Sequence, residues 1–292
     1  MVFTAYVCDD GLFLVPAFAP LAFGSISGTG CWHCSKAMFV SLLALSALLG
    51  VTTARFGGNS LGLNMLVVYI VVSAFLSISG AKLFPAYSVA LLPVFLGEQR
   101  LLYVGVVLAL ALLAVSFSWN RFPENPLRGQ YAGSQRSMVR FLSQVVLAFP
   151  LVFSASVLNN PSFLLPALWY VFVSFFNDEG ADTQFQVTQL LLAVLLGAVA
   201  DFSATSLVGT VGLPGGAFFQ ALVYAVVALL ALLLFYVVAR QAVFLPALCF
   251  VVFPFLRDGE TSYVLTADLS VLYIVVAKSM YCRFIEKNGL FK

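Results

Sequence analysis

Asp201 is the residue best suited to chemistry, because it is a lone carboxylate in a long apolar stretch. It follows the run 193–200 (AVLLGAVA) and precedes 202–213 (FSATSLVGTVGL), and neither run holds a charged residue. A charge inside a membrane costs about 2.5–3.5 kcal/mol on insertion scales, so such residues are usually functional. We expect Asp201 to exchange protons or to line a polar cavity. The alternative is a carboxylate at a helix end, in contact with water.

A second group of carboxylates lies in the polar segment 177–184 (NDEGADTQ). Asp178, Glu179 and Asp182 fall within five residues and repel one another. Partial burial would raise the pKa of at least one of them toward neutrality, which suits proton transfer. A hydrated loop between two helices explains the same spacing equally well, so both interpretations stay open.

Three arginines are candidate counter-charges for these carboxylates. Arg136 and Arg140 are four residues apart at the start of an apolar helix, so they share one face. They would either pair with the acidic cluster or extend to the membrane interface. Arg240 follows the apolar run 235–239 (FYVVA), where an interface anchor is the common arrangement.

Metal, haem and ATP chemistry find no support in the sequence. Cys31 and Cys34 form a CxxC motif, but a zinc site needs four ligands and His33 is the only histidine. Redox CxxC motifs belong to a thioredoxin-like βαβ unit, for which there is no room here. No phosphate-binding glycine loop of the P-loop form is present. We expect the chain to bind no metal or flavin, and its net charge of +2 predicts no nucleic-acid partner.

The elements that position these residues follow from composition. Of 292 residues, 62% are hydrophobic and only 9% are charged, and the mean hydropathy is +1.05. Soluble domains carry about a quarter charged residues, so this chain cannot cover a water-facing surface. A soluble enzyme is excluded, and we predict a single integral membrane domain over 1–292.

Several runs without Asp, Glu, Lys or Arg exceed the roughly 20 residues of a membrane-spanning helix. The longest continuous ones are 202–239 and 141–177. They do not alternate in the way of β-barrel strands, so we predict an all-α, polytopic bundle of about eight transmembrane helices. The expected spans are 37–54, 63–80, 101–118, 138–157, 162–176, 186–208, 217–239, 242–256 and 266–281, with 85–97 either re-entrant or a connection.

The longest polar segment, 119–136, is rich in arginine. Four arginines and a single glutamate lie within this segment or just after it: Arg121, Arg128, Arg136, Arg140 and Glu124. By the positive-inside bias, this loop is expected on the cytoplasmic side or its organellar equivalent, such as a mitochondrial matrix.

Four short motifs follow one another along the chain. The first is RFGGNSLG at 55–62, followed by Lys82-Leu83-Phe84; the second is Trp119, Tyr131-Ala132 and Arg136 before a long apolar helix. The third is Trp169, Glu179-Gly180-Ala181-Asp182, Ala200-Asp201-Phe202 and Gly215-Gly216, and the fourth is YVVAR at 236–240. Over most of residues 37–275, this order resembles subunit 1 of NADH:ubiquinone oxidoreductase, the quinone-channel membrane subunit of respiratory complex I.

The correspondence has both matches and gaps. In that family the first motif reads R-x-G-P-N-x-x-G, so Gly58 stands where the family has proline. The family's acidic loop reads E-G-E-S-E, its next helix carries A-E-Y, and the fourth motif reads F-I-W-V-R. Three family segments are missing: E-R-K before the first loop, E-T-N-R-x-P-F-D upstream of the acidic loop, and P-R-x-R-x-D after Arg240. The chain resembles a strongly diverged, shortened member.

The resemblance implies a role in the mitochondrial inner membrane, within a large respiratory complex. The substrate would be ubiquinone, and the partners would be lipid and the other membrane-arm and quinone-module subunits. The implied quinone-channel residues are Arg55, Gly57, Asn59 and Gly62. The implied charge-coupling residues are Glu179, Asp182, Asp201, Arg136 and Arg240. Such a subunit would couple NADH:ubiquinone electron transfer to proton pumping and would have no activity alone.

Two other classes of function stay open. A secondary transporter would build its site on broken helices near the membrane midplane, and Pro150 and 214–216 are candidate breaks. A non-catalytic membrane-arm or assembly subunit would tolerate loss of all the carboxylates named above.

Overall fold

The computed structural model describes residues 34–81, 83–117, 135–158, 160–177, 183–211, 216–239, 246–252 and 262–288. These residues form α-helices and one 3-10 helix, with no strand among them. The helices are α3 (Lys36–Phe56), α4 (Leu61–Ser79), α5 (Pro85–Leu96), α6 (Leu102–Phe117), α7 (Gln135–Val157), η3 (Pro161–Leu164), α8 (Pro166–Asn177), α9 (Thr183–Val211), α10 (Gly216–Ala239), α11 (Ala247–Val252) and α12 (Ser262–Asn288). The prediction of an all-α helix bundle is confirmed.

Four of these helices are long and apolar enough to cross a membrane by length and composition. They are α3, α4 and the segments Phe185–Val208 of α9 and Phe218–Ala239 of α10. Only a minority of the residues in each span are buried inside the bundle. On α10, the outward side chains include Leu229, Leu230 and Val237. A helix that is apolar on all its faces is either buried in a core or in lipid, so the chain is a membrane protein.

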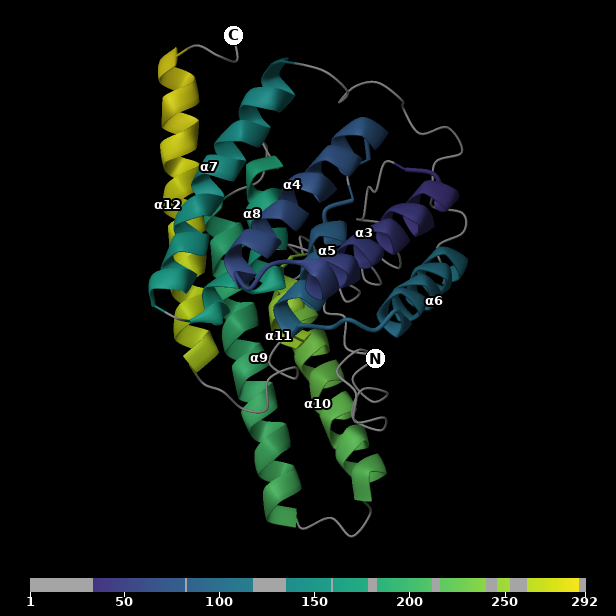
Figure 1. Ribbon diagram of the computed structural model, residues 1–292. Helices are drawn as coiled ribbons and strands as arrows, with labels where there is room; N and C mark the ends of the chain where they lie inside the picture. Colours follow the sequence, from purple (N-terminus) through teal and green to yellow (C-terminus); the bar gives the residue numbers. More distant parts are fainter. Residues whose placement is uncertain are drawn as a thin grey trace.

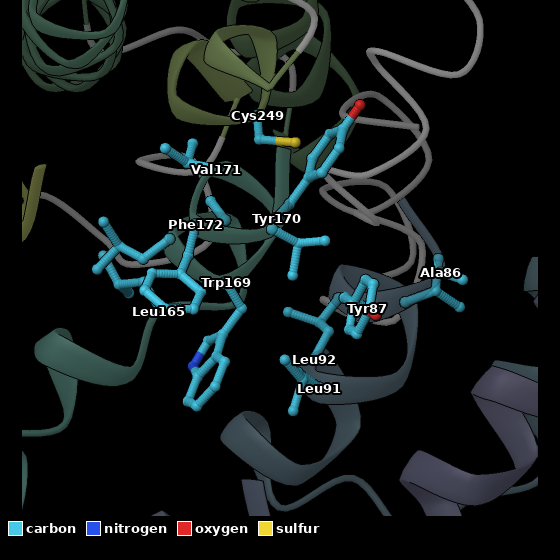
Figure 2. Close-up of a cluster of buried hydrophobic side chains, with 14 of the residues drawn as sticks. Ala86, Tyr87, Leu91, Leu92, Leu165, Trp169, Tyr170, Val171, Phe172 and Cys249 are labelled. Carbon is cyan, nitrogen blue, oxygen red and sulfur yellow. The ribbon is translucent and has the colours of Figure 1, made fainter. Parts of the chain in front are cut away.

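Three short helices, α5, α8 and α11, form the interior of the bundle. In α5 every side chain from Pro85 to Val94 is buried. Figure 1 shows the three helices in the middle of the molecule, with the longer helices around them. Figure 2 shows Trp169 of α8 beside Leu91 and Leu92 of α5, with Cys249 of α11 at the other end of the cluster. The hydrophobic core therefore includes the junction of α5 and α8.

This interior corrects one predicted span and shows that the segment 85–97 is helical. The predicted span 162–176 is the 3-10 helix Pro161–Leu164 followed by α8, which has 12 residues. Such a helix is about 18 Å long, whereas the apolar part of a bilayer is about 30 Å thick. The segment 85–97 forms α5, also of 12 residues and buried. Neither helix is long enough to cross a membrane alone.

Pro93 lies inside α5 and leaves a backbone carbonyl without its helical donor. A proline has no N–H, so the carbonyl four residues earlier, that of Val89, loses its helix hydrogen bond. The hydroxyl of Tyr103, on α6, donates to this Val89 oxygen at 2.8 Å. Tyr103 is buried, so α6 satisfies the orphan acceptor and fixes its own position against α5.

A similar cross-link joins α7 and α12 near the second helix proline, Pro150. The hydroxyl of Tyr273 on α12 donates to the carbonyl of Leu147 at 2.6 Å. The two helices run side by side in Figure 1. A tyrosine from a neighbouring helix thus bonds to the backbone close to each of these two prolines.

Small residues allow the closest helix contacts. Gly50 of α3 lies against the backbone of Ala90 in α5, and a Cβ at Gly50 would collide with the Ala90 carbonyl oxygen. Ser46 and Ala86, one turn earlier on the two helices, are also small and buried. This is the small-xxx-small spacing that lets helix backbones approach in membranes.

The connection between α3 and α4 is short, and both ends of α4 are capped. Ser60 is the N-cap of α4, and its hydroxyl accepts from the backbone N–H of Leu63 at 3.5 Å. At the other end of α4, Gly80 has a φ of 67°, which favours glycine. The amide nitrogen of Asn64 donates to the Gly58 carbonyl at 2.7 Å. The loop 57–60 is therefore held against the first turn of α4.

Candidate functional site

Asp201 lies inside a candidate membrane span and faces the interior of the bundle. The span is Phe185–Val208 of α9, so Asp201 is about two thirds of the way along it. Its side chain is only 5% exposed. Keeping a charged carboxylate there requires compensating groups. An ionisable side chain inside a membrane span is a candidate functional group.

The buried face of α9 carries two further polar side chains. Gln186 and Gln189 are each 3% exposed, and they share a face with Asp201 and with the small Ala193 and Ala204. At 1.5 Å per residue, Gln189 and Asp201 are about 18 Å apart along the helix axis. The polar groups of α9 therefore lie at two separate levels rather than in one cluster.

Helix α12 contributes polar residues that our reading of the sequence missed. Lys278, Thr266 and Ser270 are buried, and one carboxylate oxygen of Asp268 is buried with no hydrogen-bond partner in the part of the chain that the structure describes. α12 packs against α9 and α8, as Figure 1 shows for its lower half. The signal was present in the sequence, because Asp268 and Lys278 are isolated charges in an apolar segment.

The predicted partners of Asp201 are only partly placed. Glu179, Asp182 and Arg240 lie outside the described residues, and Arg136 is in the first turn of α7, with its side chain outside the description. Thr183, the sequence neighbour of Asp182, begins α9, about 27 Å along the helix from Asp201. The first residue of α9 and Asp201 therefore lie far apart on one continuous helix.

The predicted quinone-channel residues separate into an exposed loop and a buried contact. Arg55 is exposed in the last turn of α3, with its guanidinium 5.4 Å from the ring centroid of Phe56. Gly57 and Asn59 follow it in the same exposed loop. Gly62, by contrast, is buried, and a Cβ there would lie 2.6 Å from a methyl group of Val152 in α7. Gly62 therefore allows α4 and α7 to pack closely, whereas the other three residues lie at the molecular surface.

The cysteine motif is described at one position only. Cys34 is a buried free thiol just before α3, and Cys31 and His33 lie outside the described residues. Among the side chains that the structure places, no three His, Cys, Asp or Glu residues come together as metal ligands. The site chemistry visible in the structure is therefore that of carboxylate, amide, hydroxyl and amine groups.

No protein-family model matches the sequence, and no curated protein or solved structure matches it significantly. Function is therefore inferred from the residues of the chain and from where the fold places them.

Proposed function

We propose that the chain is a core membrane subunit of a proton-translocating NADH:ubiquinone oxidoreductase, of the subunit 1 type, in the mitochondrial inner membrane. The observation that carries the proposal is Asp201. The motif order puts it where the resembling family has an acidic residue on the helix after the acidic loop. The fold puts the same residue inside a membrane span and buries it. A purely structural carboxylate at a helix end would need neither feature.

In this proposal the chain forms the lipid-side part of a quinone chamber. An apolar tunnel binds a polyprenyl quinone because it removes the tail from water, at about 25 cal/mol per Å². The loop with Arg55, Gly57 and Asn59 would lie at the mouth of the tunnel, where it is open to contact. Electrons would come from a peripheral arm made of other subunits, and this chain would supply binding surface and charge.

Asp201 would connect quinone reduction to proton movement. A change of one unit charge at 10 Å alters the energy of a carboxylate by about 1.7 kcal/mol at an effective dielectric constant of 20. That energy corresponds to more than a tenfold change in its protonation equilibrium. Glu179 and Asp182, which precede α9, would sense the quinone, with Arg136 and Arg240 as counter-charges.

The test is Asp201→Asn in the native complex, with Glu98→Gln as the matched control. Glu98 lies between α5 and α6, outside the helices, and pairs with Arg100 at 3.0 Å. We expect Asp201→Asn to lower coupled quinone reductase activity at least tenfold while the complex still assembles, and Glu98→Gln to leave the activity unchanged. Unchanged activity in assembled Asp201→Asn complex would refute the role of this residue and favour a non-catalytic subunit.

A secondary transporter is the second candidate, because the fold contains short buried helices. α5 and α8 have 12 residues each, and Pro93 and Pro150 lie inside the continuous helices α5 and α7. Many transporters build their substrate sites from half-length helices inside the bundle. The purified chain in liposomes separates the two functions: solute or ion flux by the chain alone supports the transporter, whereas a complex I subunit is inactive alone.

A further inference from the structure

A cluster of polar and aromatic side chains is buried where α4, α5, α7 and α8 meet. It consists of Tyr69 and Ser73 on α4, Tyr87 on α5, Gln144 on α7 and Trp169 on α8, and each is at most 5% exposed. None of these five side chains is charged at neutral pH. Tyr87 and Trp169 are seen in Figure 2, at the junction of α5 and α8.

Tyr69 is the centre of this cluster. Its hydroxyl donates to the amide oxygen of Gln144 at 3.2 Å. Its ring centroid lies 4.9 Å from that of Trp169 and 5.3 Å from that of Tyr87. Gln144 and Trp169, from two different helices, are therefore both immediate neighbours of one tyrosine side chain.

Hydrogen bonding on the Tyr87 side of the cluster is complete. The hydroxyl of Ser73 donates its single hydrogen to the Tyr69 carbonyl at 2.7 Å. The Tyr87 hydroxyl lies 2.9 Å from the Ser73 oxygen. Because Ser73 has no second hydrogen to give, Tyr87 is the donor in this pair.

Hydrogen bonding on the other side is incomplete. The amide nitrogen of Gln144 and the indole nitrogen of Trp169 are buried and have no hydrogen-bond partner among the described residues. Both groups are donors only. Buried polar groups in native proteins are nearly always paired, and two unpaired donors beside one tyrosine are costly. The group that would pair them must be an acceptor.

We propose that Gln144 and Trp169 form a binding site for one neutral acceptor oxygen, buried between α4, α7 and α8. An oxygen with two lone pairs accepts from both nitrogens at once, and a neutral oxygen suits a site whose five side chains carry no charge. Two sources share this chemistry: an internal water, which commonly bridges such groups, and the carbonyl or ether oxygen of a lipid-soluble molecule. The site does not depend on the function proposed above.

The direct test is vibrational spectroscopy of the Trp169 indole, whose Raman bands report hydrogen bonding at the nitrogen. Trp32 and Trp119 are replaced by phenylalanine, which leaves Trp169 as the only tryptophan of the three. Spectra are recorded in native membranes and again after purification in detergent with lipids removed. A hydrogen-bonded indole in both samples identifies water, and one that is bonded only in membranes identifies a lipid-soluble ligand. A free indole in both samples overturns the proposal.

A double-mutant cycle tests the shared acceptor independently. In a Tyr69→Phe background, which removes the hydrogen bond from Tyr69 to Gln144, Trp169 is replaced by its benzothiophene analogue, which keeps the shape and lacks the N–H, and Gln144 is replaced by methionine. If both donors bind one oxygen, the two changes are non-additive by at least about threefold in the unfolding equilibrium constant. The control pairs Gln144→Met with Tyr103→Phe, whose hydroxyl bonds elsewhere, and these should be additive. Additivity in both pairs, or an analogue that stabilises the protein, would contradict the shared site.

Discussion

The hydrogen bond from Tyr103 to the carbonyl of Val89 gives the sharpest prediction about the fold. Pro93 cannot donate to that carbonyl, so the Tyr103 hydroxyl, at 2.8 Å, replaces the missing helix bond. Tyr103→Phe keeps the ring and removes the donor. A buried acceptor left without a partner costs about 1–3 kcal/mol, and we expect the free energy of unfolding to fall by that amount.

The second change in this cycle is Pro93→Ala, which restores a backbone N–H four residues after Val89. In the Pro93→Ala protein, the carbonyl has its own helical donor, so Tyr103→Phe should cost less than about 1 kcal/mol there. Unfolding is followed by circular dichroism in mixed micelles with a rising fraction of denaturing detergent. Equal costs of Tyr103→Phe in the two backgrounds would refute the replacement of the helix bond by the tyrosine.

A matched control for this cycle is Tyr224→Phe on α10. Its hydroxyl lies 3.2 Å from that of Thr205 on α9, in an exposed position. Thr205 is able to bond to its own helix backbone when the tyrosine hydroxyl is removed. This change should therefore alter stability by less than about 0.5 kcal/mol, which separates loss of a buried bond from the general effect of removing a tyrosine hydroxyl.

Three further predictions concern packing, capping and thiol reactivity. Gly50→Ala should lower the free energy of unfolding by about 1–3 kcal/mol, because the new Cβ meets the Ala90 backbone. The control is Gly105→Ala, where the Cβ enters open space, and this change should raise the free energy of unfolding by up to about 1 kcal/mol in the same detergent titration. Equal effects of the two changes would contradict the contact between Gly50 and Ala90. Gly80→Ala should cost about 1–2 kcal/mol, because the φ of 67° strains an alanine; a neutral result would contradict that cap. Burial raises the pKa of the Cys34 thiol to about 12, so maleimide at pH 8 should label it only after denaturation, by peptide mass spectrometry; rapid labelling of the native protein would show that the thiol is accessible.

The four candidate spans illustrate what the sequence predicts well. Helices α3, α4, α9 and α10 match four expected spans within three residues at each end. These spans are, in the same order, 37–54, 63–80, 186–208 and 217–239. A long apolar run between polar loops has few alternatives in a membrane, because every backbone polar group must be bonded within the segment. Chain composition therefore determined these elements almost completely.

The interior helices and their polar contacts show where sequence reasoning stops. An apolar run such as 162–176 has the same composition whether it crosses the membrane or is broken inside the bundle, so α8 was predicted as a span. The Tyr103 bond to Val89 and the pairing of Tyr69 with Gln144 join residues from different helices. Contacts of this kind depend on how helices pack, which single-sequence periodicity does not contain.

Some residues of the candidate site were predictable from the sequence, and others were not. Asp201 was identified from its sequence context, since one charge in an apolar run is visible without a structure. Asp268 and Lys278 are also isolated charges on an apolar helix, but they belong to none of the four motifs and were not predicted as site residues. The close contact of Gly62 with Val152 was not predictable, because a glycine in a motif does not reveal which neighbour approaches it, and its place in the quinone channel stays a prediction.

The most direct test of the proposed function is to ask which assembly contains the chain. Native-gel separation of the source membranes, with an in-gel NADH dehydrogenase stain, is combined with mass spectrometry of each band. The tryptic peptides 122–128 (FPENPLR) and 129–136 (GQYAGSQR) identify the chain. Membership in complex I predicts that both peptides run with the large NADH-oxidising band. Peptides that run alone, or with a band that does not oxidise NADH, would contradict the proposal and place the secondary transporter first.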